Sequence, residues 1–386
     1  LLNDDRDGES LPPDRLPPYA IVLANTSTSY DAEVSIKTAE GEYAQAVAER
    51  TVASDVALPG TNYVTVHSEL VGQDGTRLQG PISGEIKNIP MPKQSLLTLV
   101  LPSRPVPFGK SSLGKLAYKV ESNQPIVAYQ FNPLCCNYNF TNDASLLLPK
   151  SALTKNYMQM SYAVWNGGDR PTDDPFPPTI TVLATEPDTR VDVTLRAPKG
   201  TTTDGEPRPY SEVIYPFDSE QSRVTGPNQD GEITVTMQPF EVLNVAGAGV
   251  SPTEDLTGSL IEASKPIAVF GGHSCAYVPF NSPACDHLES QLFPLETWGK
   301  RFVASALKIR QEDPTGSREA TYWKFLAREN ETRIDTGIDI SRPNVLPPAD
   351  QGVPFCEEFS ENPSSGVFTL DQGETCEFGT RSTFVV

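Results

Sequence analysis

The sequence predicts an all-β chain of tandem antiparallel β-sandwich units, and three observations support this fold class. Apolar and polar residues alternate with a period of two at residues 63–67, 191–195 and 233–237, which is typical of half-buried strands. The 36 prolines fall between apolar runs, where they indicate short strands joined by rigid loops, because proline cannot donate to a sheet ladder. In addition, one strand-forming segment occurs twice along the chain.

The duplicated segment is a polar turn that ends in Pro-Ile and continues into an apolar stretch. It reads VESNQPIVAY at residues 120–129 and IEASKPIAVF at residues 261–270. A second recurring pattern, an apolar stretch and an alternating stretch separated by a polar turn, starts around Leu23, Leu183 and Leu326. We therefore expect three copies of one unit of about seven strands, the third without its Pro-Ile segment.

The repeats predict how the chain is divided. A closed β-propeller built from the repeats is the alternative to tandem sandwiches. Because the chain starts without Met and the third copy stops early, we expect either a fragment whose third repeat is cut off or a last unit that is naturally short, with any signal peptide or anchor absent from this sequence. The expected parts are an acidic, Pro-rich linker at 1–17, a first β repeat at 18–157, a second at 158–300, and a third, incomplete repeat at 301–386.

Composition limits the classes of partner. The 50 Asp and Glu residues outnumber the 30 Lys and Arg residues, which gives a formal charge of −20 and a pI near 4.6. Such a field repels nucleic-acid phosphates and anionic membrane surfaces, so we expect neither as a partner. No apolar stretch approaches the length of a transmembrane helix, and we expect no transmembrane segment in this chain.

Six cysteines fall along the sequence as three neighbouring pairs, which favours local disulfides and an oxidising compartment. We therefore expect an exported protein that is extracellular or attached to the cell surface. The adjacent cysteines of the first pair either close a vicinal bond or reach other partners, and the spacing leaves both alternatives open. The expected disulfide cysteines are Cys135, Cys136, Cys275, Cys285, Cys356 and Cys376.

The densest polar cluster, at residues 273–289, contains two histidines, two cysteines and two carboxylates. Imidazole and thiolate are donors that zinc takes, so a metal site competes here with a disulfide that closes the loop between the two cysteines. With the disulfide formed, the remaining metal-ligating candidates are His273, Asp286, His287 and Glu289. They would support a metal-dependent hydrolase, whereas the favoured interpretation needs no cofactor.

Three further features of the sequence suggest ligand-binding or contact sites. Acidic clusters at 3–8 and 169–174 provide oxygen ligands for calcium, but solvated loop charge is the simpler interpretation. Exposed aromatic residues such as Trp165 or Trp298 would suit a carbohydrate-binding module, and core packing is the competing explanation. Loops 171–178 and 200–216 are the expected variable contact surfaces.

Four segments together resemble the IgGFc-binding protein N-terminal domain family. They are SNQPIVAYQFNP at 122–133, NDASLLLP at 142–149, KPIAVFGGHSC at 265–275, and CDHLESQLFP at 285–294 followed by Trp298-Gly299. The NDASLLLP and Cys-Cys-Asn segments are similar to the bacterial branch of the family. The family is named after a secreted, mucus-associated animal protein that binds the Fc part of immunoglobulin G. The resemblance implies an interaction protein without established catalytic residues and a structural bond between Cys275 and Cys285.

From these features we expect a non-enzymatic binding or adhesion module that acts outside the cell or on its surface. Rigid β units with long Pro-rich loops can present varied contact surfaces on a stable scaffold. The acidic surface favours basic or cation-bridged partners. The expected partner is an extracellular protein or glycan that the sequence does not identify, and the alternatives are the metal-dependent hydrolase and the carbohydrate-binding module.

Overall fold

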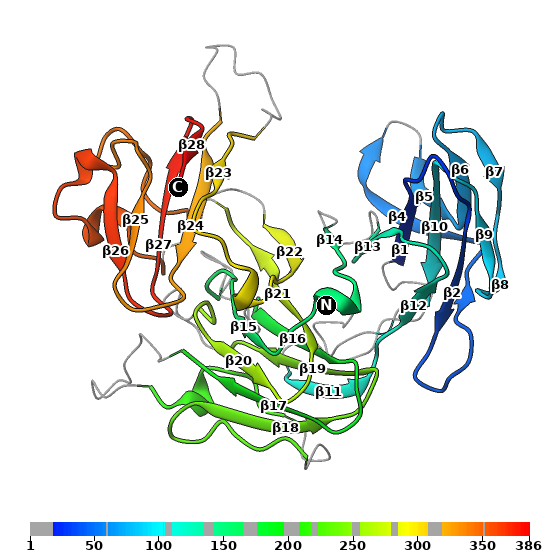
Figure 1. Ribbon diagram of the computed structural model, residues 1–386, viewed down its shortest axis with the longest axis horizontal. Coiled ribbons are helices and arrows are strands. Elements are labelled where there is room, and N and C mark those ends of the chain that lie inside the picture. Colours follow the sequence, from blue (N-terminus) through cyan, green and yellow to red (C-terminus); the bar gives the residue numbers. More distant parts are fainter. Residues whose placement is uncertain are drawn as a thin grey trace.

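The predicted all-β fold of antiparallel units is confirmed by a computed structural model of the chain (Figure 1). In the described part of the chain there is no α-helix, and all paired strands run antiparallel. The described residues are 18–58, 61–102, 104, 110–134, 143–164, 176–196, 208–217, 223–248, 255–278, 285–307, 319–349 and 352–386. The predicted linker at 1–17, the acidic clusters, Cys135, Cys136 and Trp165 lie outside these residues, as do parts of the two predicted contact loops.

Unit 1 packs two sheets around an aliphatic core. The core side chains come from alternate residues of both sheets, as in β2, where Ala32, Val34 and Ile36 are buried and the residues between them are not. The larger sheet has the order β14 (Ala144–Leu146), β13 (Val127–Phe131), β1 (Tyr19–Asn25), β10 (Ser95–Leu101), β6 (Glu69–Gly72) and β7 (Arg77–Gln79). The smaller sheet has the order β12 (Lys119–Ser122), β2 (Ala32–Lys37) and β9 (Ile89–Met91).

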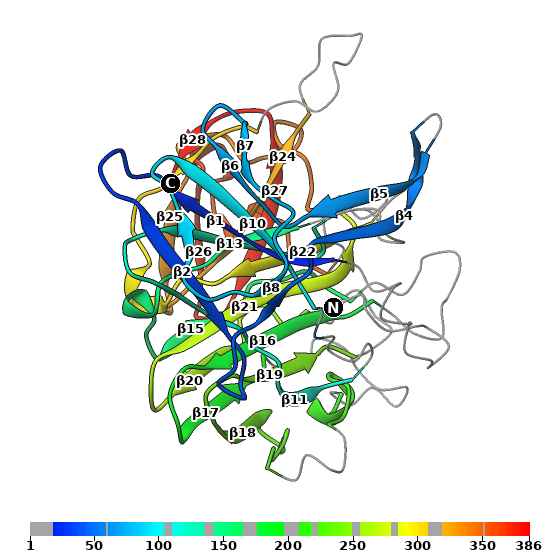
Figure 2. The same cartoon turned by 90° about the vertical axis from the view of Figure 1, so that its right-hand side faces the viewer.

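Two further strand pairs extend unit 1. They are β3 (Gln45–Ala46) with β8 (Gly84–Glu85), and β4 (Glu49–Leu58) with β5 (Thr61–His67). Figure 2 shows the long hairpin of β4 and β5 projecting away from the two sheets.

Unit 2 repeats the arrangement of paired sheets around a larger core. One sheet has the order β11 (Ser112–Lys115), β19 (Glu241–Ala246), β16 (Pro178–Ala184), β21 (Ile267–Ala276) and β22 (Asp286–Gln291). The other has the order β15 (Asn156–Met158), β20 (Leu260–Ala263), β17 (Thr189–Thr194) and β18 (Glu232–Met237). Every residue of β21 is buried, because this strand lies between β16 and β22 and is covered on both faces. Strand β11 follows unit 1 strands in the chain but pairs within unit 2.

Unit 3 is smaller and has an aromatic core. The ring of Phe325 lies 5.3 Å from that of Phe368 and 5.5 Å from that of Phe378, measured between centroids. Such contacts stabilise a small core beyond the apolar area they bury. The strand pairs are β24 (Thr321–Leu326) with β27 (Thr375–Thr380), β25 (Thr332–Asp335) with β26 (Val367–Leu370), and β23 (Val303–Ala304) with β28 (Phe384–Val385).

Short 3₁₀ turns connect the strands of units 2 and 3 and the junction before unit 2. They are η1 (Lys150–Ala152), η2 (Tyr210–Glu212), η3 (Leu295–Thr297), η4 (Cys356–Phe359) and η5 (Pro363–Ser365). Each core lies between facing sheets, as in the predicted sandwiches, while the small sheets follow one another around the molecule in a way consistent with the propeller alternative (Figure 1).

The duplicated Pro-Ile segment has the same place in units 1 and 2. Its first part pairs in the smaller sheet, as β12 on β2 and β20 on β17. Its second part pairs in the larger sheet, as β13 on β1 and β21 on β16. Pro125 and Pro266 stand where the chain crosses from one sheet to the other, a position that suits a residue without a backbone donor. The segment therefore crosses between the two sheets and pairs with one strand of each.

The sequence pattern aligns Leu23 with Leu183, but this alignment is one residue away from the structural one. Leu23 is buried in the unit 1 core, whereas Leu183 packs on the opposite face of its sheet, away from the unit 2 core. Leu23 pairs with Ala128 and Val182 pairs with Val269, each the third residue after the Pro of its segment. Val182 is therefore the counterpart of Leu23, since a shift of one residue reverses the face of a strand.

The units are joined by side chains that hydrogen-bond across their boundaries. Between units 1 and 2, the amide of Leu148 donates to Gln291 Oε1 at 2.8 Å, and the amide of Gln291 donates to Ser145 Oγ at 2.7 Å. Between units 2 and 3, Lys324 Nζ donates to Asp255 Oδ2 at 2.6 Å. Burial acts to raise the pKa of this carboxyl, but the Lys324 charge and its hydrogen bond together hold the pKa below its ordinary value. These contacts fix the edge of one sheet against the next.

We predict that Lys324→Met destabilises the contact between units 2 and 3 by about 3–5 kcal/mol, because it leaves the Asp255 carboxylate buried without its cation. The matched control is the double variant with Asp255→Asn, which removes both charges and should recover part of this loss. Urea unfolding of four proteins measures the effect, namely the unmodified chain, the two single variants and the double variant. Losses of the single variants that simply add in the double variant would contradict the role of the ion pair.

Candidate functional site

A cavity of about 430 Å³ lies between unit 1 and unit 2. One wall is the inner face of β1 and β13, which contributes Ile21 and Ala128. The other wall is the face of β16 and β21 that points away from the unit 2 core, with Leu183 and Phe270. Both walls are strands with hydrogen-bonded neighbours, so the cavity is preformed. Its lining is mainly apolar, as in most ligand sites.

The polar end of the cavity is formed by Glu289 of β22, a carboxylate that is only 8% exposed. Gln130 Nε2 donates to Glu289 Oε1 at 2.8 Å, and Asn132 Nδ2 donates to Oε2 at 3.3 Å. Both amides come from unit 1, whereas the carboxylate comes from unit 2. The buried charge therefore has hydrogen-bond donors only because the two units meet here, and it depends on their relative position.

Two stacked tyrosines line the unit 1 side of the cavity. Tyr19 and Tyr118 stack with their ring centroids 6.1 Å apart, and the guanidinium of Arg104 lies 4.6 Å from the centre of the Tyr118 ring. The Tyr19 hydroxyl donates to Gln130 Oε1 at 3.4 Å, which extends the hydrogen-bond chain that reaches Glu289. Burial, followed by the Glu289 charge, raises the pKa of Tyr19, so this phenol stays protonated and remains a donor.

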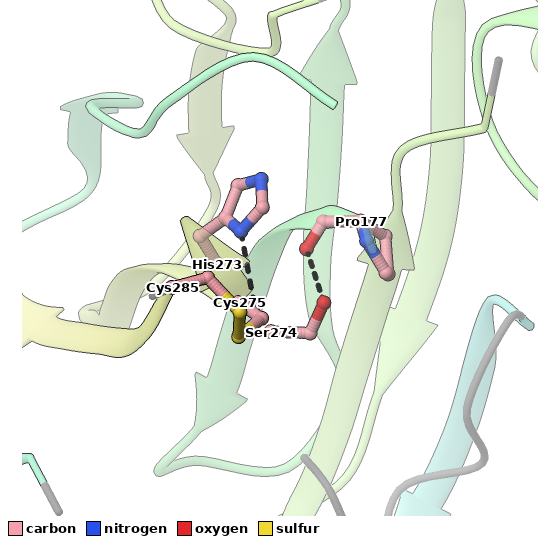
Figure 3. Close-up of a disulfide and its surroundings, with 5 residues drawn as sticks. All are labelled: Pro177, His273, Ser274, Cys275 and Cys285. Carbon is pink, nitrogen blue, oxygen red and sulfur yellow. Dashed lines mark hydrogen bonds between the residues drawn. A yellow bond between two sulfur atoms is a disulfide. The ribbon is translucent and has the colours of Figure 1, made fainter. Parts of the chain in front are cut away.

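His273 lies on β21 beside the disulfide that joins Cys275 to Cys285 (Figure 3). Its Nδ1 accepts from the amide of Cys275 at 3.1 Å, and its Nε2 donates to the carbonyl of Ala163 at 2.8 Å. Both ring nitrogens are used within the fold, and burial lowers the pKa of His273 to about 4, so the ring is neutral at pH 7. The Ser274 hydroxyl donates to the carbonyl of Pro177 at 3.2 Å.

The four residues predicted as a metal set are divided between two faces of one sheet. His287 and Glu289 share a face of β22, with His287 Nε2 3.7 Å from Glu289 Oε2. Asp286 precedes His287 and points to the opposite face, and His273 pairs in register with Leu288, which shares that face. Within the described ranges, no group of three or more His, Cys, Asp or Glu side chains could hold a metal ion. The geometry does not favour the hydrolase alternative.

Two of the local cysteine pairs expected from the sequence are disulfides. The bond between Cys275 and Cys285 joins the end of β21 to the start of β22, and the bond between Cys356 and Cys376 joins η4 to β27. Trp298, the carbohydrate-binding candidate inside the described residues, is half-buried, and its Nε1 donates to the carbonyl of Phe293 at 3.1 Å. None of these side chains lines the cavity.

The sequence pattern singles out Glu289 as a metal ligand, and no motif marks the other residues that line the cavity. Its two polar donors, Gln130 and Asn132, lie more than 150 positions from Glu289 in the chain. One signal was present in the sequence, since Gln130 interrupts the apolar run that follows Pro-Ile in the first copy. A polar residue within an apolar strand indicates a polar partner nearby.

Comparison with known proteins gives one family. A family model described as IgGFc binding protein matches residues 143–352, which is more than half of the chain and includes β14, most of unit 2 and the start of unit 3. The human IgGFc-binding protein (Homo sapiens) is 39% identical over 75 residues, which is 19% of this chain and 1% of the human protein. The chain thus covers only a small part of that relative's length. No solved structure matches the chain.

We predict that the buried His273 makes the free energy of unfolding depend on pH below the pKa that this histidine has in the unfolded chain. Because its pKa is about 4 in the folded protein and near 6.5 when unfolded, the unfolded chain takes up a proton between these values and the folded protein does not. The free energy of unfolding should therefore fall from pH 6.5 to pH 4, by on the order of 3 kcal/mol from this group. His273→Gln should remove this contribution in urea unfolding at pH 4.5 and 7, whereas an unchanged difference between the two pH values would contradict it.

We also predict that the cavity accepts an apolar probe. The dye 8-anilinonaphthalene-1-sulfonate should fluoresce with the native protein, and Ala128→Phe, which fills the space beside Ile21, should reduce the signal by about threefold or more. Thr236→Phe adds the same ring at an exposed position of β18 and serves as the control. Equal fluorescence from both variants would place dye binding elsewhere.

Proposed function

This chain belongs to the IgGFc-binding protein family, and on that premise we propose that it is a non-enzymatic binding module that contacts an extracellular protein through the cavity between units 1 and 2. The observation that carries the proposal is a preformed, mainly apolar cavity with one hydrogen-bonded polar end. Such a site takes apolar side chains of a partner and orients them with few polar groups. The human relative is named for binding the Fc part of immunoglobulin G.

Placement outside the cell is part of this proposal. The two disulfides suit an oxidising compartment, in which such bonds persist. The net charge of −20 keeps the protein soluble and disfavours anionic surfaces as partners. In the part of the chain that the structure describes, no helix is long and apolar enough to cross a membrane. We further propose that the chain is a cell-surface or secreted adhesion protein of the bacterial branch.

We also propose the repeat boundaries at 158 and 301 and the vicinal bond between Cys135 and Cys136. The cavity depends on neither, because its two walls are residues of β1, β13, β16, β21 and β22.

The first test uses the human IgG Fc fragment as the probe, because the human relative carries that name. Biolayer interferometry should show binding with a Kd of about micromolar strength, weakened about tenfold or more by Ala128→Phe and unchanged by Thr236→Phe. Equal binding by the two variants would move the contact away from the cavity. No binding by the unmodified chain would remove the Fc fragment as a partner.

A further inference from the structure

The buried charge at the polar end of the cavity is held by neutral donors. The two carboxylate oxygens of Glu289 accept from the side-chain amides of Gln130 and Asn132. Among the residues that the structure describes, no lysine or arginine lies within ion-pair distance of Glu289, and His287 Nε2 is 3.7 Å from Oε2, beyond hydrogen-bond distance. Buried charges in proteins are normally paired with an opposite charge as well as hydrogen-bonded. The fold therefore leaves this carboxylate able to take a cation.

A second carboxylate lies next to the first. Asp143 Oδ2 accepts from the backbone amide of Glu289 at 2.5 Å, and its Oδ1 accepts from the amide of Ala144 at 2.8 Å. These donors, like the two side-chain amides on Glu289, carry no charge. Two neighbouring acidic groups with neutral donors make positive charge favourable at this end of the cavity.

Three basic residues also line the cavity, and each has a carboxylate partner in the chain. The pairs are Arg104 with Glu40 at 3.9 Å, Lys119 with Glu121 at 2.6 Å, and Lys150 with Glu186 at 3.1 Å. The charges of these three side chains are thus balanced within the fold, whereas the charge of Glu289 is not. The unmatched charge of the lining is therefore negative.

The apolar walls suit the stem of a basic side chain. Ile21 and Ala128 line the unit 1 side, and Leu183 and Phe270 line the unit 2 side. Lysine and arginine have an aliphatic stem of about three or four methylene groups, which packs on apolar surface while the charged head reaches a polar group. A cavity that combines apolar walls with one buried anion has the chemistry that such a side chain needs.

We propose that the cavity binds a lysine or arginine side chain of the partner, with the stem between the two walls and the charged head on Glu289. This inference rests on the proposed function, because it names the partner chemistry for the same cavity. The formal charge of −20 attracts basic surfaces at long range, so steering and recognition act in the same direction. A neutral side chain would fill the walls but leave the carboxylate without a cation, and an acidic side chain would be repelled.

The test compares three small probes that share one apolar body and differ in charge, namely phenylbutylammonium, phenylbutanol and phenylbutanoate. Calorimetric titration of the whole chain should give a Kd of about 0.1–1 mM for the cation. The alcohol should bind about tenfold more weakly, and the anion should show no measurable binding. Equal binding of the cation and the alcohol, or no binding of the cation, would overturn the inference.

Variants of the chain locate the charge that the cation recognises. Glu289→Gln removes the charge and nearly keeps the shape, so the cation and the alcohol should then bind within about twofold of each other. Glu262→Gln removes the same charge from an exposed position of β20 and is the matched control, which should keep the tenfold preference. A preference that survives Glu289→Gln would overturn the role of this carboxylate. The comparison of probes on the unmodified chain does not depend on how well this variant folds.

The variant Ala128→Phe separates this inference from the proposed function. If the unmodified chain binds the cation and the alcohol equally and Ala128→Phe removes both, the cavity remains the binding site and the charge preference alone is wrong. If Ala128→Phe leaves the binding of both probes unchanged, the cavity is not the site, and the proposed function and this inference are both overturned.

Discussion

Each complete unit depends on one interaction, the pairing of a Pro-Ile strand with the outer edge of the central strand of its larger sheet. The segment enters from the smaller sheet, turns at Pro, and then covers the central strand, so that a single stretch of chain links both layers. Its inward residues, such as Ile267 and Val269, are fully buried, and each contributes about 1.5–3 kcal/mol by leaving water. The pairing therefore fixes the position of the two sheets relative to each other.

The same strand positions the candidate site. In unit 2, β21 carries Phe270 on the cavity wall and His273 on the opposite face, and it ends at Cys275 of the disulfide. The disulfide and the strand ladder hold β22 in place, and β22 presents Glu289 to the amides of unit 1. The cavity thus lies where units 1 and 2 meet. The polar end of the cavity requires this contact, because a carboxylate buried without the amide donors of unit 1 would be strongly unfavourable.

The sequence predicted the class of fold and the Pro-Ile duplication but only part of the site. Strand periodicity and proline placement are local signals, and they were sufficient for an all-β chain. Register is not local, which is why Leu23 was matched with Leu183 although Val182 takes its place. Alternation also separated Asp286 from His287 and Glu289, residues that composition alone had grouped as metal ligands. The cavity could not be read from the sequence, because Gln130 and Glu289 meet only through the packing of two units.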